Sequence, residues 1–144
     1  MKRSVKMPNE LPKVLKDNVD DDSLSFAIHI NGKYAVIEVP GCVDEKTLKV
    51  DDPDVQHLIE RADTYTEYVP RSGGIRIIGR SFGGRAVDLG TSSDSDQTMA
   101  MYRRCDRWVD ISGIPILNDD RLRNLDKIMH ELMDTWDRHT LDDE

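Results

Sequence analysis

Four arginines and five glycines are interleaved in one short stretch of this 144-residue chain. The arginines are Arg71, Arg76, Arg80 and Arg85, and no acid lies among the fifteen residues 71–85, although the whole chain carries a formal net charge of −8. Backbone amides of a glycine-rich turn can point together at a phosphate, and an arginine side chain can bind it through two parallel hydrogen bonds. The stretch therefore indicates a site for a nucleotide or a nucleic-acid backbone.

The candidate anion contacts continue further along the chain. Because phosphate contacts need a local excess of Lys and Arg, an acidic chain can hold nucleic acid only at a local site. A second interpretation stays open, in which the arginines form a strand face that pairs with the chain's own Asp and Glu. The candidate contacts are Arg71, Ser72, Gly73, Gly74, Arg76, Arg80 and Arg85, extended by Arg103, Arg104 and Arg107.

Other chemistries lack the residue patterns that they need. The four histidines have no metal-ligand spacing, and Cys42 and Cys105 lie far apart without a second Cys or His beside them. No Gly-x-Ser-x-Gly turn marks a nucleophilic serine. No apolar run approaches the roughly 18 residues of a membrane span, and the Lys/Arg-bearing first residues lack the apolar stretch of a secretory signal. We therefore expect a soluble, cytoplasmic protein with reduced thiols, no resident metal and no membrane partner.

The first half of the chain predicts a β-hairpin and a helix. Two β-rich segments, 24–30 and 34–39, flank Asn31-Gly32-Lys33, and Asn-Gly between such segments is a strong hairpin signal. Pro53 behind Asp51 and Asp52 is typical of a first helical turn. Apolar residues then recur at helical spacing, at Val55, Leu58, Ile59 and Ala62.

The second half predicts further strands and a closing helix. Strands are expected near 65–69, 75–79, 86–89, 98–102 and 107–111, with a polar loop over 90–96. From Asn118 or Asp119 onward, an apolar stripe at helical spacing predicts the final helix. The stripe is Leu122, Leu125, Ile128, Met129, Leu132, Met133 and Trp136.

These elements describe an α+β fold with a mixed or antiparallel sheet and two packing helices. The length suits a single domain, which we place at residues 23–138. Residues 1–22 change from basic to acidic and form either a tail or a short extra element, and residues 139–144 form an acidic tail.

Two segments resemble the core of the primase–polymerase proteins of phages and plasmids. The first is residues 64–80, where a strand leads through a Ser/Gly turn into a strand that carries Arg76 at the family's His/Arg position. The second is residues 102–113, where Tyr102 is followed by the Arg-aromatic-x-x-x-Ser-Gly pattern of Arg107 to Gly113. The resemblance implies a primase–polymerase-like fold over residues 34 to 136.

The resemblance also implies where catalytic carboxylates should lie. Nucleotidyl transfer uses two divalent metals held by acids, and the family takes these acids from an early strand pair and one later strand. The early pair falls on Glu38 and Pro40, and the late acid falls on Ala100, so one of three positions keeps its carboxylate. Asp88 is the best substitute, and Mg or Mn would be needed if the protein is an enzyme.

We therefore expect a degenerate primase–polymerase-like protein of a phage or mobile element that acts by binding and not by catalysis. Its partner would be nucleic acid, a nucleotide, or a host or defence nucleoprotein complex that it inhibits, as an anti-CRISPR does. Two alternatives stay open. One is a minimal metal-dependent primase that uses Glu38 and Asp88, and the other is a pure protein-interaction module.

Overall fold

The central layer of the fold is a six-stranded sheet. The computed structural model describes residues 2–4, 25–89, 99–117 and 122–142. The strand order is β11-β6-β7-β3-β9-β8, and every neighbouring pair is antiparallel. The strands are β3 (Tyr34–Val39), β6 (Thr66–Val69), β7 (Gly74–Arg80), β8 (Val87–Leu89), β9 (Ala100–Arg103) and β11 (Pro115–Leu117).

A smaller sheet covers one face of the central sheet. It contains β1 (Lys2–Ser4), β2 (Ser25–His29) and β10 (Trp108–Ile111). β1 pairs with β2 in parallel, and β2 pairs with β10 antiparallel. Inward side chains of the two sheets form one apolar cluster, which includes Ile28, Val109 and Ile111 from the small sheet and Val36 and Ile78 from the central sheet.

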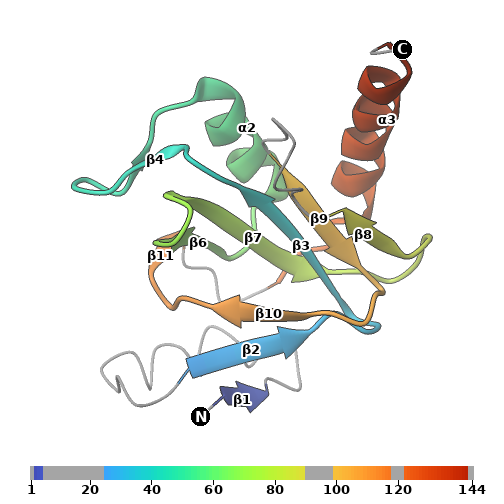
Figure 1. Cartoon of the computed structure of the whole chain (residues 1–144), viewed down its shortest axis with the longest axis horizontal. Coiled ribbons are helices and arrows are strands. Elements are labelled where there is room, and N and C mark those ends of the chain that lie inside the picture. Colours follow the sequence, from blue (N-terminus) through green and yellow to red (C-terminus); the bar gives the residue numbers. More distant parts are fainter. Residues whose placement is uncertain (1, 5–24, 90–98, 118–121, 143–144) are drawn as a thin grey trace.

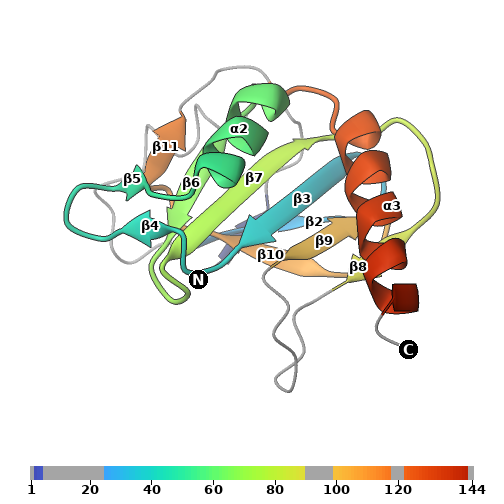
Figure 2. The same cartoon turned by 90° about the horizontal axis from the view of Figure 1, so that it is seen from above.

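Two helices, α2 (Pro53–Ala62) and α3 (Asp126–Asp142), cover the opposite face, as Figure 2 shows. Asp52 caps α2 by accepting from the amide of Asp54, and Pro53 occupies the first turn as predicted. A short hairpin of β4 (Val43–Asp44) and β5 (Lys49–Val50) precedes α2. The α+β class with antiparallel pairing and two helices is thus confirmed for the described residues. None of the helices described is long and apolar enough to cross a membrane.

The predicted hairpin of residues 24–39 is wrong in its pairing. The turn at Asn31-Gly32-Lys33 forms, with Gly32 at a φ of 131°. However, β2 pairs with β1 and β10, whereas β3 pairs with β7 and β9. The turn therefore carries the chain from one sheet to the other. Alternating apolar residues suit both arrangements, because side chains of the two strands pack across the layers instead of side by side.

The final helix begins later than predicted. Leu122 and Leu125 are buried, as the apolar stripe requires, but they lie in an extended segment beside the end of β7. There the amide of Arg80 donates to the carbonyl of Arg123 at 2.8 Å, and the amide of Leu125 donates to the carbonyl of Arg80 at 2.9 Å. These bonds replace a first helical turn. Residues 118–121, the predicted loop 90–96 and most of the N-terminal segment 1–22 lie outside the described residues.

Candidate functional site

Three charged residues form a row across the middle of the central sheet. Glu67 on β6 pairs in register with Arg76 on β7, and Arg76 pairs with Glu38 on β3. The Arg76 guanidinium donates to Glu67 at 2.7 Å and to Glu38 at 3.1 Å. The Glu67 side chain is fully buried and that of Arg76 is 9% exposed. Two carboxylates thus bind the cation that we predicted as a phosphate contact.

Three further donors hold the buried carboxylate of Glu67. The Tyr65 hydroxyl donates at 2.9 Å, and the backbone amides of Ser112 and Gly113 donate at 2.9 and 3.2 Å. Burial and the neighbouring Glu67 charge raise the pKa of Tyr65 far above its usual value, so the hydroxyl keeps its proton. Burial alone would lower the pKa of Arg76, but the two carboxylates raise it above its usual value. The charges of Glu67 and Arg76 are therefore bound by partners within the protein.

The glycine turn before β7 is also engaged within the protein. The amides of Ser72 and Gly73 both donate to the carbonyl of Val69, at 3.2 and 2.9 Å. A Cβ on Gly74 would lie 1.9 Å from the carbonyl oxygen of Val39, so this glycine allows two backbones to approach. Of the predicted turn contacts, Arg71 and Ser72 have exposed side chains. The turn amides are bound within the fold and do not form an open phosphate cradle.

The positions that the resemblance assigns to metal-binding acids lie close together. Glu38 pairs in register with Ala100 on β9, so the row across the sheet runs Glu67, Arg76, Glu38, Ala100. Asp88 lies on β8, beyond β9, and its carboxylate is 2.9 Å from the Arg107 guanidinium. Each candidate carboxylate therefore already has an arginine partner. Within the described ranges, no group of three or more His, Cys, Asp or Glu side chains could hold a metal ion.

The remaining predicted cations gather at the other end of the sheet. Arg80 ends β7 opposite Tyr34, and Arg103 ends β9 opposite Ala35 and Val87. The turn between β2 and β3 and the start of β10 lie at this same end, on the right in Figure 1. Bonds from Ser81 to Lys33 and from Ile30 to Arg107, both 2.9 Å, join these segments. We call this region the arginine–aromatic end; it comprises His29, Lys33, Arg80, Phe82, Arg85, Arg103, Arg104, Arg107 and Trp108.

Two aromatic side chains are exposed at this end. Phe82 is 63% exposed and Trp108 is 54% exposed, and these are the large hydrophobic residues found exposed in the described part of the chain. The Arg80 guanidinium lies 4.4 Å from the centre of the Phe82 ring. Trp108 stacks on His29 with ring centres 4.6 Å apart and planes inclined by 2°. Cations and open rings thus occur together.

Asp126 shapes this end from the first turn of α3. Its carboxylate accepts from the Ser81 hydroxyl at 2.7 Å and from the amides of Phe82 and Gly83 at 2.9 and 3.3 Å, and Arg103 lies 3.4 Å away. Burial alone would raise the pKa of Asp126, but these hydrogen bonds and the Arg103 charge lower it below its usual value. Asp126 therefore fixes the loop that presents Phe82.

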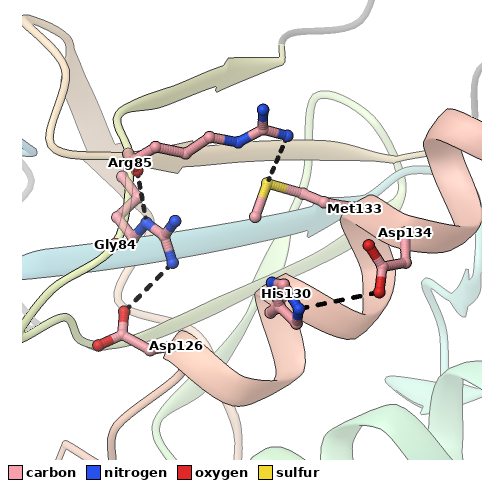
Figure 3. A pocket seen from close by; sticks show the side chains of 7 residues that line it. Gly84, Arg85, Asp126, His130, Met133 and Asp134 are labelled. Carbon is pink, nitrogen blue, oxygen red and sulfur yellow. Dashed lines mark hydrogen bonds and ion pairs between the residues drawn. The ribbon is translucent and has the colours of Figure 1, made fainter.

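A pocket of about 480 Å³ opens between this loop and α3 (Figure 3). The Arg85 guanidinium points across it to the sulfur of Met133 at 3.8 Å, and His130 lies 3.8 Å from Asp134. Arginine and aspartate side chains both line the pocket, so it carries no clear excess of one charge. Its lining residues are Gly84, Arg85, Arg103, Asp126, His130, Met133 and Asp134.

A scan against protein-family models gave no match, and a search of curated proteins gave none. The predicted site residues therefore have to be interpreted from their geometry. Arg71, Ser72, Gly73 and Gly74 lie at the turn end of the sheet, Arg76 lies in the buried row, and Arg80, Arg85, Arg103, Arg104 and Arg107 lie at the arginine–aromatic end. Sequence reasoning missed Glu67, Asp126 and Trp108 as participants. Glu67 was detectable in part, since it alternates with Tyr65 and Val69 on one face of a predicted strand, where a buried position is expected.

Proposed function

We propose that this protein is a degenerate primase–polymerase-like protein that binds single-stranded nucleic acid at its arginine–aromatic end and does not transfer nucleotides. The observation that carries the proposal is the placement of six cations, of which only Arg103 is buried, and two exposed aromatic rings at one end of an otherwise acidic chain. Open rings contact bases only where bases are unpaired, and arginines neutralise the backbone beside them. A single strand is therefore the ligand that this surface fits best.

The charge at this end supports the same proposal. The cations are Lys33, Arg80, Arg85, Arg103, Arg104 and Arg107, and the carboxylates in contact with this end are those of Asp88, Asp106 and Asp126. Among the described residues, six cations face these three carboxylates and that of Asp134 in the pocket, which leaves a positive surplus. Because phosphate contacts depend on a local surplus and not on net charge, the overall −8 does not oppose binding here.

The buried row supports the absence of catalysis. Two-metal transfer needs several carboxylates that are free to bind the ions. Glu38 is bound by Arg76, its neighbour in the row is Ala100, and Asp88 is bound by Arg107. A metal would have to displace an arginine from each carboxylate before it could bind.

A binding assay with two matched variants tests the proposal. The ligand is a fluorescent 20-nucleotide single strand, measured at low and high salt without metal. The double variant R85A/R104A removes two exposed cations from the arginine–aromatic end, and R71A/K49A removes two exposed cations from the turn end. We expect the first to weaken low-salt binding about tenfold and the second to leave it nearly unchanged. Equal losses would contradict the assignment of the site.

A second assay separates binding from catalysis. Primer extension with Mn²⁺ or Mg²⁺ and nucleoside triphosphates should give no product. Product that E38A abolishes would overturn the proposal and favour a minimal primase. No binding of the strand by the unchanged chain would also overturn it and favour a protein partner.

A further inference from the structure

Trp108 occupies an outward position that the sheet fixes. Along β10, Val109 and Ile111 point into the core between the two sheets, so Trp108 and Asp110 point outward. Trp108 pairs in register with His29 at the end of β2. Cross-strand neighbours on one face of a sheet can contact each other directly. The register therefore places the two rings together on an outer face.

The two rings form a prepared stack. Their planes are inclined by 2° and their centres lie 4.6 Å apart. The His29 ring is also held at its edge by Asp106, whose carboxylate lies 2.7 Å from Nε2. The stack can cover only one face of the indole, and 54% of Trp108 stays exposed. The Trp108 ring is thus held in place while more than half of its surface stays open to solvent.

We infer that Trp108, supported by His29, is a stacking platform for an unpaired nucleobase. This inference rests on the proposed function and adds the part of the strand that the surface recognises. Bases stack on aromatic rings whatever their sequence, because every base has a π face. Arg107 and Arg104 come from the turn just before Trp108, so the backbone of a strand stacked there would pass beside cations.

Arg107 is itself held in position. Its guanidinium lies 4.6 Å from the centre of the Tyr102 ring and 2.9 Å from the Asp88 carboxylate. Burial would lower the pKa of Arg107, but Tyr102 and Asp88 raise it above its usual value, so it keeps its charge. A fixed ring beside a fixed cation loses little conformational freedom when a nucleotide binds.

The test compares a normal single strand with an abasic strand of the same length and charge. The parent carries W136F, so that Trp108 is the tryptophan that emits, and the affinities of W108A and W108F in this background are measured with fluorescently labelled strands. Binding of the normal strand should quench this emission, and the abasic strand should not. W108A should weaken binding of the normal strand by roughly 5- to 150-fold, with W108F keeping most of the affinity. Binding of the abasic strand should be the same with and without W108A.

The outcomes separate the platform from the proposed function. If W108A binds the normal strand as tightly as the parent does, the platform is overturned and the strand-binding function stands. Equal weakening for both strands would also overturn it, because a base contact cannot affect an abasic ligand. If the parent binds neither strand, both proposals are overturned. Unchanged thermal melting of W108A, expected from its exposure, shows that lost binding is not lost folding.

Discussion

The two ends of the central sheet use arginine in opposite ways. Toward the turn end, Arg76 is buried between two carboxylates, and the amides of Ser72 and Gly73 donate to a carbonyl of the protein itself. At the arginine–aromatic end, Arg85, Arg104 and Arg107 are exposed, and so are the rings of Phe82 and Trp108. The Arg/Gly pattern that suggested a phosphate site lies mainly at the turn end, in residues 71–76. Of the four exposed arginines among the predicted contacts, Arg71 lies at the turn end, and Arg85, Arg104 and Arg107 lie at the second end.

The difference shows that register decides whether an arginine on a strand is available. Arg76 faces an acid on each neighbouring strand, so its charge is neutralised before any ligand arrives. Arg80, four residues later on the same strand, faces Tyr34 and extends over the Phe82 ring. Residue spacing along one strand does not reveal what lies across from it.

Breaking the buried row should give the largest effect. E67Q keeps the shape of the side chain but removes one of the two carboxylates that bind Arg76. The buried Arg76 charge is then only partly neutralised. Removal of one partner from a buried ion pair typically costs about 3–5 kcal/mol. We expect the free energy of unfolding, measured by urea denaturation, to fall by about this amount, and binding of the single strand by the folded fraction to persist.

E38Q is the matched control for E67Q. Its side chain is 26% exposed, whereas that of Glu67 is fully buried. Water can therefore replace much of the lost interaction, and the expected cost is about 1 kcal/mol or less. Equal costs for E67Q and E38Q would mean that Glu67 is not the charge that anchors the row.

Much of the fold was predictable because the strands show clear apolar alternation and clear turn residues. β6, β7 and β10 and helix α2 lie close to their predicted positions. The pairing of β2 was not predictable, since its alternating apolar residues fit a hairpin with β3 as well as a second layer. Leu122 and Leu125 have helical spacing, yet backbone bonds to Arg80 hold them in an extended segment. Long-range pairing overrode both local signals.

The candidate site was less predictable, because its features depend on contacts between distant segments. The second interpretation in the sequence, that the arginines pair with the chain's own acids, describes Arg76 well. It does not extend to Arg104, which is exposed at a φ of 52° in the turn after β9. Trp108 looked like an ordinary strand residue until the register placed it on His29. Exposure, and not residue type, separates the two groups.

Low pH should reduce the stability of the protein by protonating Asp126, which holds the loop at the arginine–aromatic end. The folded-state pKa of this carboxyl is lowered, so its stabilising effect is present above the ordinary aspartate pKa of about 3.9 and is lost as pH falls through the folded value. D126N should reduce the free energy of unfolding by about 1–3 kcal/mol near neutral pH. The difference from the unchanged chain should shrink as pH falls. Urea denaturation at several pH values measures it.

D134N on the same helix is the control for Asp126. Its carboxylate is 59% exposed and lies 3.8 Å from His130. Its removal should change stability by a few tenths of a kcal/mol. If the cost of D126N stays constant down to low pH, Asp126 acts through shape alone and not through its charge.

Of the changes considered, neutralising Asp88 should have the smallest effect, and that effect should be confined to the arginine–aromatic end. This carboxylate binds Arg107, and both side chains are nearly half exposed. D88N removes a negative charge from the proposed strand-binding surface, while the Tyr102 ring still positions the Arg107 guanidinium. We expect single-strand affinity at low salt to rise about two- to fivefold, with stability changed by less than about 1 kcal/mol. Fluorescence titration measures the first quantity and urea denaturation the second.

The same variant separates binding from catalysis, because the two functions require opposite results. As a metal ligand, Asp88 would be essential, and D88N would abolish any primer extension. As a counter-charge at a binding surface, Asp88 weakens the attraction between the strand and Arg107, and this effect outweighs its help in positioning a guanidinium that Tyr102 also holds. D44N on β4, at the turn end, makes the same charge change far from this surface and should leave strand affinity unchanged. An equal gain from D44N would indicate that net charge, and not the arginine–aromatic end, controls binding.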